Sequence, residues 1–498
     1  MATFALFSWP LIAMALIFVL GRMKGVIWCI LVPALLLPER VVYDLPALPP
    51  YDKEMSIVLG LLLGLFAVKF RKGTYVPPEI ANPKIKKWLY GLSGLLVLSA
   101  FLTVFSNGER LVFGPTVLPG LGIRDLISMV FQTLMFLGIY FIAQRHLSTP
   151  EAHTQLLRAF VLVGLVYTLP ILFEIRMSPQ LHRWTYGLFQ HSWNQHVRGG
   201  HFRPIVFMPH GLWIGILLTT CVMSAFILLK NKVKAGQPRA QYFLIGLWFM
   251  GVLLISRNFG ASAIALVLVP VLWFLRYRAQ ILIAMVIMIL FLVHPALRQT
   301  ELVTLEGVAE RVGQIAPERQ RSFEFRLENE ASMLERAAEK PLAGWGLWAR
   351  WRVYDPVTGE DTTTADGRWI IMLGERGWIG YIAYFGLLTL PTLLLLRTAR
   401  RRELTQATAG LGLIMSAVIV YQIPNDTIGP LVLIVAGALS GFVLHKGQEE
   451  AGLEVDTGPP HNRYTRFPGH TAVRTPREGA TPHTRSRPAA SIKQPLSS

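Results

Sequence analysis

A polar stretch near the middle of the chain gathers many of the side chains that could do chemistry. Residues 176–204 contain four histidines together with arginines and aromatic residues: His182, His191, His196, His201, Arg198, Arg203, Trp184, Tyr186 and Trp193. Histidines can bind zinc, but the spacing here is irregular and matches no metal-binding motif, so we expect no metal site. Arginine offers a fork of donors that fits a phosphate group. Arg198 and Arg203 are therefore candidate anion ligands, although basic and aromatic residues also form the ordinary interfacial belt of membrane proteins.

Arg257 stands in a tight turn between two apolar runs, within the sequence LLISRNFGASAIAL. An arginine in such a place must face a protein cavity, an aqueous cleft or the headgroup layer. Snorkelling to lipid phosphates would explain it without any function. The functional interpretation is a further ligand for an anion, because a guanidinium group pairs well with phosphate.

A second polar stretch, residues 295–369, is expected to contain an amphipathic helix over residues 321–340. The apolar stripe of this helix consists of Phe323, Leu327, Ala331, Leu334 and Ala338. Pro341 bounds the helix, and a glycine-punctuated turn follows it as far as Gly346. Asp366, just before the next apolar run, is a candidate general base or an anchor for an acceptor hydroxyl. The alternative is a turn or N-cap aspartate that opens the next helix.

These polar stretches interrupt a chain that is suited to hydrocarbon. It has 498 residues, of which 52% are hydrophobic and 16% charged, whereas about a quarter of the residues are charged in a soluble domain. The candidate spans are 4–20, 25–37, 55–69, 88–105, 126–143, 155–175, 205–229, 241–256, 260–275, 279–294, 370–396, 408–423 and 428–445. A helical span needs about 20 apolar residues. We therefore predict an all-α polytopic membrane protein with about 12–13 transmembrane helices, the count depending on the short segment 25–37.

The net charge of +18 comes largely from alternate loops. Lys and Arg concentrate at 21–24, 70–87, 144–158, 230–240, 276–278 and 397–402, whereas the opposite short loops hold only Arg40, Lys53, Arg110, Arg124 and Arg257. The positive-inside rule makes the first set cytoplasmic, so that residues 176–204 and 295–369 share the outer face. The N-terminus faces outward with thirteen spans and inward with twelve. This charge pattern indicates membrane insertion and not nucleic-acid binding.

The remaining composition sets the domain organisation. Residues 1–445 are expected to form one membrane domain, and residues 446–498, rich in Pro, Thr, Arg and Gly, a disordered basic cytoplasmic tail. Cys29 and Cys221 both lie in apolar runs, which excludes a disulfide framework and a thiolate metal site. The first apolar run lacks a basic leader and a cleavage site, so it is expected to stay as a helix.

Three motifs follow one another over residues 190–400. The first is RGGHFRPIVFMPHGLWIG, in which Arg198 or Arg203 precedes Pro209-His210 at the start of a span. The second is Ser256-Arg257, followed by a helix rich in small residues. The third joins Arg326 on the amphipathic helix, the turn 341–346 and the sequence ERGWIG at 375–380. Together they resemble the O-antigen ligase and O-antigen polymerase superfamily, which are bacterial membrane glycosyltransferases with a C-type fold.

The chain departs from that family at two places. Pro209-His210 stands where members often have Pro-Asn, and Asp366-Gly367 stands where many have a His-Asn pair nine residues before the glutamate. The missing histidine favours a polymerase or an exopolysaccharide relative over a ligase.

The resemblance implies transfer or polymerisation of glycan repeat units at the periplasmic face of the bacterial inner membrane, without metal or cofactor. The donor would be a polyprenyl-diphosphate-linked glycan and the acceptor a saccharide or a lipid-linked saccharide. Arg257, with Arg203 or Arg198, would hold the diphosphate, and Asp366 would take the acceptor proton. The auxiliary residues would be His201 and His210 as rival bases, Arg326, and Trp345 against a sugar face. Membrane lipid and polysaccharide export machinery are the further partners expected.

Two other classes of protein fit the same composition. A transporter or flippase of lipid-linked saccharides would also have many helices, but it should show internal repeats and charges near the bilayer midplane. A non-catalytic scaffold in a secretion complex would need no converging arginines. The polar residues here concentrate on one side, which favours an enzyme.

Overall fold

The computed structural model describes residues 1–44, 50–69, 78–198, 200–236, 239–299, 317–400 and 403–445. The side chains of Arg198, Lys234 and residues 317–323 lie outside this description. The expected tail 446–498 and the first part of the second polar stretch also fall outside the described residues. The predictions made for these segments and side chains, including the anion-ligand role of Arg198, therefore stay predictions.

An α-helix lies at every one of the predicted spans. These helices are α1 (Ala2–Leu20), α2 (Arg22–Leu36), α3 (Lys53–Lys69), α4 (Pro83–Phe105), α5 (Ile123–His146), α6 (Pro150–Met177), α8 (Gly211–Lys234), α9 (Ala240–Ile255), α10 (Phe259–Phe274), α11 (Tyr277–Gln299), α14 (Arg368–Thr398), α15 (Gln406–Tyr421) and α16 (Pro430–Leu444). Among the described residues, seven helices are long and apolar enough to cross a membrane. They are α1, α4, α5, α6, α8, α11 and α14, and the shorter apolar helices are α9, α10, α15 and α16. The protein is thus an all-α polytopic membrane protein.

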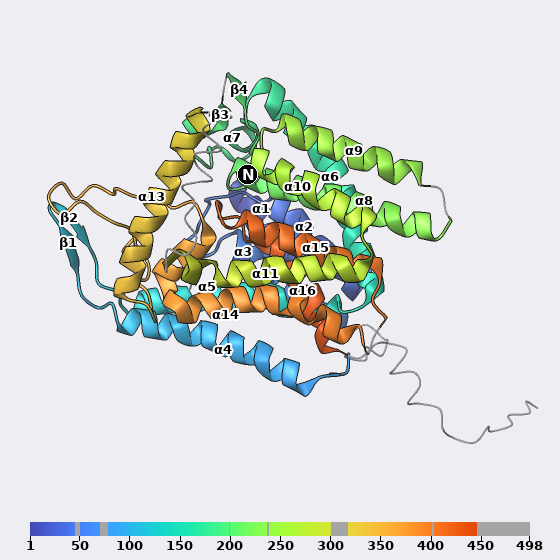
Figure 1. The fold of residues 1–498 in the computed structure, drawn as a ribbon, viewed down its shortest axis with the longest axis horizontal. Helices are drawn as coiled ribbons and strands as arrows, with labels where there is room; N and C mark the ends of the chain where they lie inside the picture. Colours follow the sequence, from blue (N-terminus) through green and yellow to red (C-terminus); the bar gives the residue numbers. More distant parts are fainter. Residues whose placement is uncertain are drawn as a thin grey trace, which may run out of the picture. The chain divides into compact units, whose positions relative to one another are not determined.

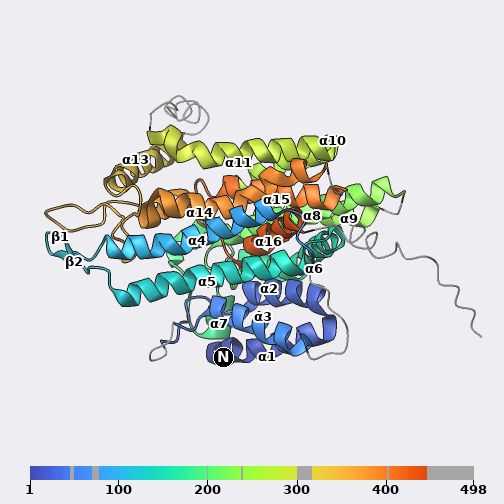
Figure 2. The same ribbon diagram turned by 90° about the horizontal axis from the view of Figure 1, so that it is seen from below.

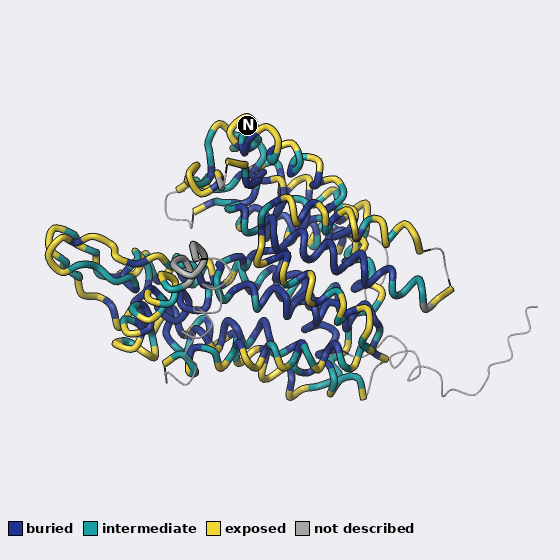
Figure 3. The backbone as a smooth tube through the Cα atoms, turned by 45° about the horizontal axis from the view of Figure 1, so that its top comes forward, coloured by how far each residue is buried: buried dark blue, intermediate teal, exposed yellow. Residues whose placement is uncertain are grey.

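The helices pack around a centre formed by α8, α15 and α16, whose residues are almost all buried. Helix α16 packs on α5, α11 on α15, and α14 on α4, while α1 lies at the edge against α3 (Figures 1 and 2). The burial pattern agrees, because buried residues fill the middle of the bundle and exposed ones line its outside (Figure 3). An apolar outer surface on peripheral helices is what a lipid environment requires.

Short elements connect the helices on the side that the charge pattern predicts to face outward, here called the outer side. The first outer loop, residues 178–210, contains α7 (Leu181–Tyr186), the 3-10 helix η1 (Trp193–His196) and the antiparallel strands β3 (Val197–Arg198) and β4 (His201–Phe202). A second hairpin, β1 (Leu111–Phe113) with β2 (Thr116–Leu118), joins α4 to α5. Helix α8 begins at Gly211 and not at residue 205, because Pro204 and Pro209 keep the preceding segment irregular.

The second outer loop, described over residues 317–367, begins with the amphipathic helix α13 (Pro317–Glu339). It matches the expected segment 321–340 to within one residue at its end, but the expected stripe is wrong in part. Ala331 and Ala338 are exposed, and Met333 and Ala337 are buried beside Leu334 instead, because the helix turns a neighbouring face to the bundle. In Figure 1, α13 stands beside the β1–β2 hairpin at the left edge of the bundle.

Helix α14 is not the single span that its hydropathy predicts. Gly377 has φ +61° and ψ −168°, so two helical segments meet there at a kink. The guanidinium carbon of Arg368 lies 5.4 Å from the centre of the Tyr384 ring. In a straight helix these residues would be about 24 Å apart along the axis, beyond the reach of the two side chains. The segment before Gly377 therefore folds back against the segment after it.

Candidate functional site

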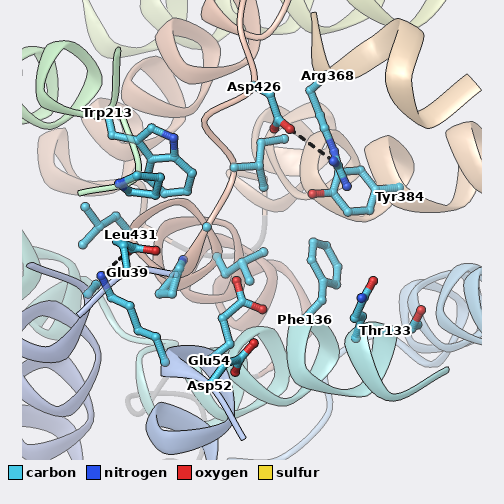
Figure 4. A pocket seen from close by; sticks show the side chains of 18 of the residues that line it. Glu39, Asp52, Glu54, Thr133, Phe136, Trp213, Arg368, Tyr384, Asp426 and Leu431 are labelled. Carbon is cyan, nitrogen blue, oxygen red and sulfur yellow. Dashed lines mark hydrogen bonds and ion pairs between the residues drawn. The ribbon is translucent and has the colours of Figure 1, made fainter. Parts of the chain in front are cut away.

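A cavity of about 530 Å³ opens among the outer ends of α2, α3, α8, α14 and α16 and reaches side chains of α4 and α5 (Figure 4). Its lining is unusual for a membrane bundle because ionisable residues crowd it. They are Glu39, Arg40, Asp52, Lys53, Glu54, Arg368, Glu375, Arg376 and Asp426. Charged residues at such positions are costly, and they usually mark a substrate or ion site.

Several cations of the cavity have carboxylate or carbonyl partners. Lys53 pairs with Glu39, and the Arg368 guanidinium lies 3.2 Å from the Asp426 carboxylate. Arg376 donates to the Thr133 hydroxyl at 2.8 Å and to the Met129 carbonyl at 3.2 Å, so it ties α14 to α5. The charges of Lys53 and Arg368 are thus paired within the lining, whereas Arg376 contacts neutral oxygen atoms.

Carboxylates form another part of the lining. Figure 4 shows Asp52 and Glu54 next to each other, on the opposite side of the view from Arg368 and Tyr384. Burial raises the pKa of the Asp52 carboxyl, and a hydrogen bond that it accepts from the Met55 N–H at 2.9 Å lowers it in part. A raised pKa makes this half-buried carboxylate a stronger proton acceptor than an ordinary aspartate.

The kink in α14 places Glu375 and Arg376 in the cavity lining. The turn 341–346 packs on this kink by backbone hydrogen bonds: Trp345 N–H to Gly374 O at 2.8 Å, Gly346 N–H to Glu375 O at 2.9 Å, and Trp378 N–H to Pro341 O at 2.7 Å. A Cβ atom on Gly344 would lie 2.6 Å from the Arg376 nitrogen. The turn 341–346 and the sequence 375–380 therefore contact each other through their backbones.

A buried carboxylate organises the first outer loop. Glu174, fully buried near the end of α6, accepts hydrogen bonds from the backbone N–H groups of Leu181, Ile205 and Val206 at 3.1, 2.9 and 2.7 Å. The Gln190 amide adds a bond to the Val206 carbonyl at 2.8 Å. Both ends of the loop are therefore fixed to the same helix end. Nothing in the local sequence pattern distinguishes Glu174 from an ordinary helix-terminal charge.

The segments that carry two predicted anion ligands meet in the structure. Arg203 is only 2% exposed and donates a hydrogen bond to the side chain of Asn258, the residue after Arg257. Arg257 is partly buried and has φ +57°, a left-handed conformation that costs energy in a residue other than glycine. Arg40 shares this feature with φ +56°. Strained backbone of this kind concentrates at functional sites.

The fold also brings together three histidines whose spacing in sequence is irregular. The ligand atoms of His191, His196 and His210 all lie within 4.8 Å of one another. The other two histidines of this region are elsewhere: His182 bonds to the Leu188 carbonyl at 2.8 Å, and His201 is exposed on β4. The argument from spacing therefore missed a histidine cluster that only the tertiary structure creates.

The histidine cluster borders the cavity. Burial lowers the pKa of His191, and the nearby charges of Arg40 and Arg203 lower it further. Arg40 and Pro209 also line the cavity. The cavity that Asp52 lines therefore adjoins the loop that carries the histidine cluster and Arg203.

Asp366 and Arg326, predicted separately, form an ion pair. The Arg326 Nε lies 3.3 Å from the Asp366 carboxylate, with both side chains more than a third exposed. Arg298 lies 3.9 Å from Glu330 on the same side of α13. Burial raises the pKa of Glu330 to about 7 against the opposing effects of Arg298 and Arg326. Asp366 is two residues from Arg368, which lines the cavity.

Trp345 does not offer a face to a sugar. It is 5% exposed, the Arg336 guanidinium lies 3.3 Å from its ring centre, and its indole N–H donates to the Arg336 carbonyl. His210 likewise has a structural role, because its Nδ1 accepts the Leu212 N–H at 3.1 Å as the N-cap of α8. A comparison of the chain with known family models and with curated proteins gave no match.

Proposed function

We propose that the protein transfers glycan units from a polyprenyl-diphosphate donor to a saccharide acceptor at the outer face of a bacterial inner membrane. The observation that carries the proposal is the cavity at the outer helix ends, which is lined by buried, half-buried and exposed charges of both signs and is joined at Pro209 by the loop that carries Arg203. A lipid-linked donor enters such a site from the bilayer, with its prenyl chain left in hydrocarbon.

The donor's leaving group determines what the basic residues do. As the acceptor oxygen bonds to the anomeric carbon, the bond from that carbon to the diphosphate oxygen breaks, and negative charge grows on the diphosphate. Guanidinium groups that grip this charge more strongly in the transition state lower the barrier. Arg257 and Arg203 are assigned this role, and Arg40 joins them because it lines the cavity and its charge acts on His191, as that of Arg203 does.

A carboxylate receives the proton that the acceptor hydroxyl loses. Asp366 is accessible to solvent at the outer side and ion-paired, so it is the first candidate. Asp52 is the second, because it lines the cavity and burial raises its pKa. The polymerase interpretation remains preferred over the ligase interpretation because residue 366 is an aspartate.

The position of the cavity supports an enzyme over a transporter. Its charged lining comes from the outer ends of helices, including residues 39–40 after α2, 52–54 at the start of α3 and Asp426 before α16. A transporter would require a polar path that continues to the cytoplasmic ends of the helices.

The test is reconstitution of the purified protein in lipid nanodiscs with a synthetic polyprenyl-diphosphate oligosaccharide. We expect glycan chain growth, or transfer to a lipid-linked acceptor when one is supplied. Asp366→Asn and Asp52→Asn, assayed side by side, identify the base, since loss of a general base costs about 10²–10⁴-fold in rate. Absence of any new glycosidic bond with either acceptor would reject the proposal.

A further inference from the structure

The histidine cluster of the first outer loop has the composition of a metal site. His191 comes before η1, His196 ends η1, and His210 precedes α8, so three separate backbone positions converge. Their ring centres are 4.5–5.3 Å apart. Imidazole nitrogen is a preferred ligand of zinc and of related transition-metal dications.

The geometry requires only a small adjustment. Three atoms no more than 4.8 Å from one another leave a central point about 2.8 Å or less from each, whereas zinc–nitrogen bonds are about 2.0–2.1 Å. Each ring would have to move by about 0.7 Å to reach the zinc–nitrogen distance. Rotation of the side chains alone can supply this movement.

The surroundings hold the rings and bury one of them. His196 is fully buried, and the Phe189 ring packs edge-on against it with centres 5.9 Å apart. The β3–β4 hairpin follows His196 directly, and the Arg203 N–H bonds back to the His196 carbonyl at 2.8 Å. A metal bound here would therefore fix the segment that carries Arg203.

Two nearby cations favour an anion as the fourth ligand. Arg40 and Arg203 both act on His191 electrostatically, and they oppose a bare dication. An anion in the open fourth position would balance this charge and pair with the guanidinium groups as well. Three neutral histidines with an exchangeable fourth ligand are a known arrangement for zinc.

His210 must change its hydrogen bond when it binds a metal. At present its Nδ1 accepts the Leu212 N–H. Coordination through Nδ1 uses that lone pair, and coordination through Nε2 puts a proton on Nδ1, so the cap is lost either way. Loss of a cap costs about 1 kcal/mol, which is small beside about 10 kcal/mol for structural zinc binding.

We propose that His191, His196 and His210 bind one zinc-class dication with an anionic fourth ligand, and that this metal orders the first outer loop. The inference goes beyond the proposed function and does not depend on it. The metal is not assigned a part in glycosyl transfer.

The experiment uses untagged full-length protein in nanodiscs, stripped with chelator and then incubated with zinc or cobalt alone. After desalting, elemental analysis should find about one equivalent of metal per chain. His191→Ala and His196→Ala should reduce it at least tenfold, while the matched control His201→Ala, an exposed histidine of the same loop, should retain it. His210→Asn keeps an N-cap acceptor but removes the ligand, so it should fold normally and bind no metal.

Cobalt reports on the fourth ligand through its visible spectrum, which should change when inorganic phosphate is added. Stripped wild-type protein that takes up no metal would overturn the proposal. So would full metal uptake by a folded His196→Ala variant, or a cobalt spectrum that phosphate leaves unchanged. Since no glycan donor is present, these results stand apart from success or failure of the transfer assay.

Discussion

Two regions at the outer side, the first outer loop and helix α13, are fixed by different forces. The loop is tied at both ends to buried Glu174 by three backbone hydrogen bonds. Helix α13 buries one apolar turn near its C-terminal end. Before that turn, its described side chains make polar contacts, such as the bond from the Thr364 N–H to Asn329 and the exposed pair of Arg326 with Asp366. Exposed ion pairs contribute about 0–1 kcal/mol each, whereas a buried carboxylate with several donors is costly to remove.

The comparison suggests a division of roles. The first outer loop is a rigid platform that sets Arg203 beside the turn of Arg257, as an electrostatic site requires. Helix α13 carries exposed ion pairs, so its packing should depend more on charge than that of the first outer loop does. Four changes test this difference.

The largest effect is expected for Arg257→Ala, in the turn that the first outer loop contacts through Arg203. If the proposed function holds, the variant loses a guanidinium that binds the growing diphosphate charge, so the transfer rate should fall about 10²–10³-fold. Membrane insertion should be unchanged. Arg124→Ala, which removes an exposed arginine at the same outer side, is the matched control and should remain active. Normal product from Arg257→Ala would remove this residue from the mechanism.

The next largest effect is expected when the buried carboxylate that anchors the first outer loop is removed. Glu174→Ala leaves three loop N–H groups without their acceptor, and the cost should be about 3–5 kcal/mol. We expect a lower thermal unfolding temperature and faster proteolysis within residues 178–210. Glu151→Ala, at the exposed first turn of the same helix, should behave as wild type. Equal protease resistance in the two variants would contradict the account.

The turn 341–346, which packs on the kink in α14, should be sensitive to substitution for a steric reason. Gly344→Ala puts a methyl group 2.6 Å from the Arg376 backbone at a position with φ +67°, which should cost about 1–3 kcal/mol and displace the kink. The transfer rate should fall along with stability. Gly108→Ala, which meets nothing within 4 Å, is the control. If both variants unfold at the same temperature, the backbone contact is not tight.

The smallest expected effect is a pH dependence of the packing of helix α13. The pKa of Glu330 rises from 4.5 to about 7 in the folded protein, so docking is favoured when this group is protonated. The contribution is fully present below about pH 4.5 and is lost as the pH rises through about 7. Protection factors of the α13 amides, corrected for the intrinsic pH dependence of hydrogen exchange, should therefore be higher at pH 5.5 than at pH 8, by a few-fold.

Glu330→Gln should abolish this pH dependence, whereas Glu335→Gln, at an exposed position on the same helix, should preserve it. Protection factors in α13 that are the same at both pH values in the wild type would show that the charge of Glu330 does not govern its packing.

Much of the fold follows from local sequence patterns. Hydrocarbon favours long apolar helices wherever they occur, so the predicted spans and the amphipathic helix all appear, with α8 displaced by Pro204 and Pro209. The kink at Gly377 was not predicted, because it depends on a backbone contact with Gly344. The signal that was present is Glu375-Arg376 inside an apolar run, which hydropathy alone averages away.

The candidate site was predicted less completely. Arg203 lies next to the turn of Arg257, as expected, whereas the pairing of Asp366 with Arg326 was not predicted. The cavity lining was missed, since Arg40, Asp52 and Arg368 look like ordinary charges at helix ends. The histidine cluster was also missed, because no helical spacing relates residues 191, 196 and 210.

The most direct test of the central claim counts products. Wild-type protein in nanodiscs, given the lipid-linked donor, should release about one polyprenyl diphosphate for each glycosidic bond formed. Arg203→Ala should lose both products together, and Arg110→Ala, which changes an exposed arginine on the outer side, should lose neither. Glycosidic bonds formed at the wild-type rate by Arg203→Ala, or donor moved across the bilayer with no bond formed, would contradict transfer at this site.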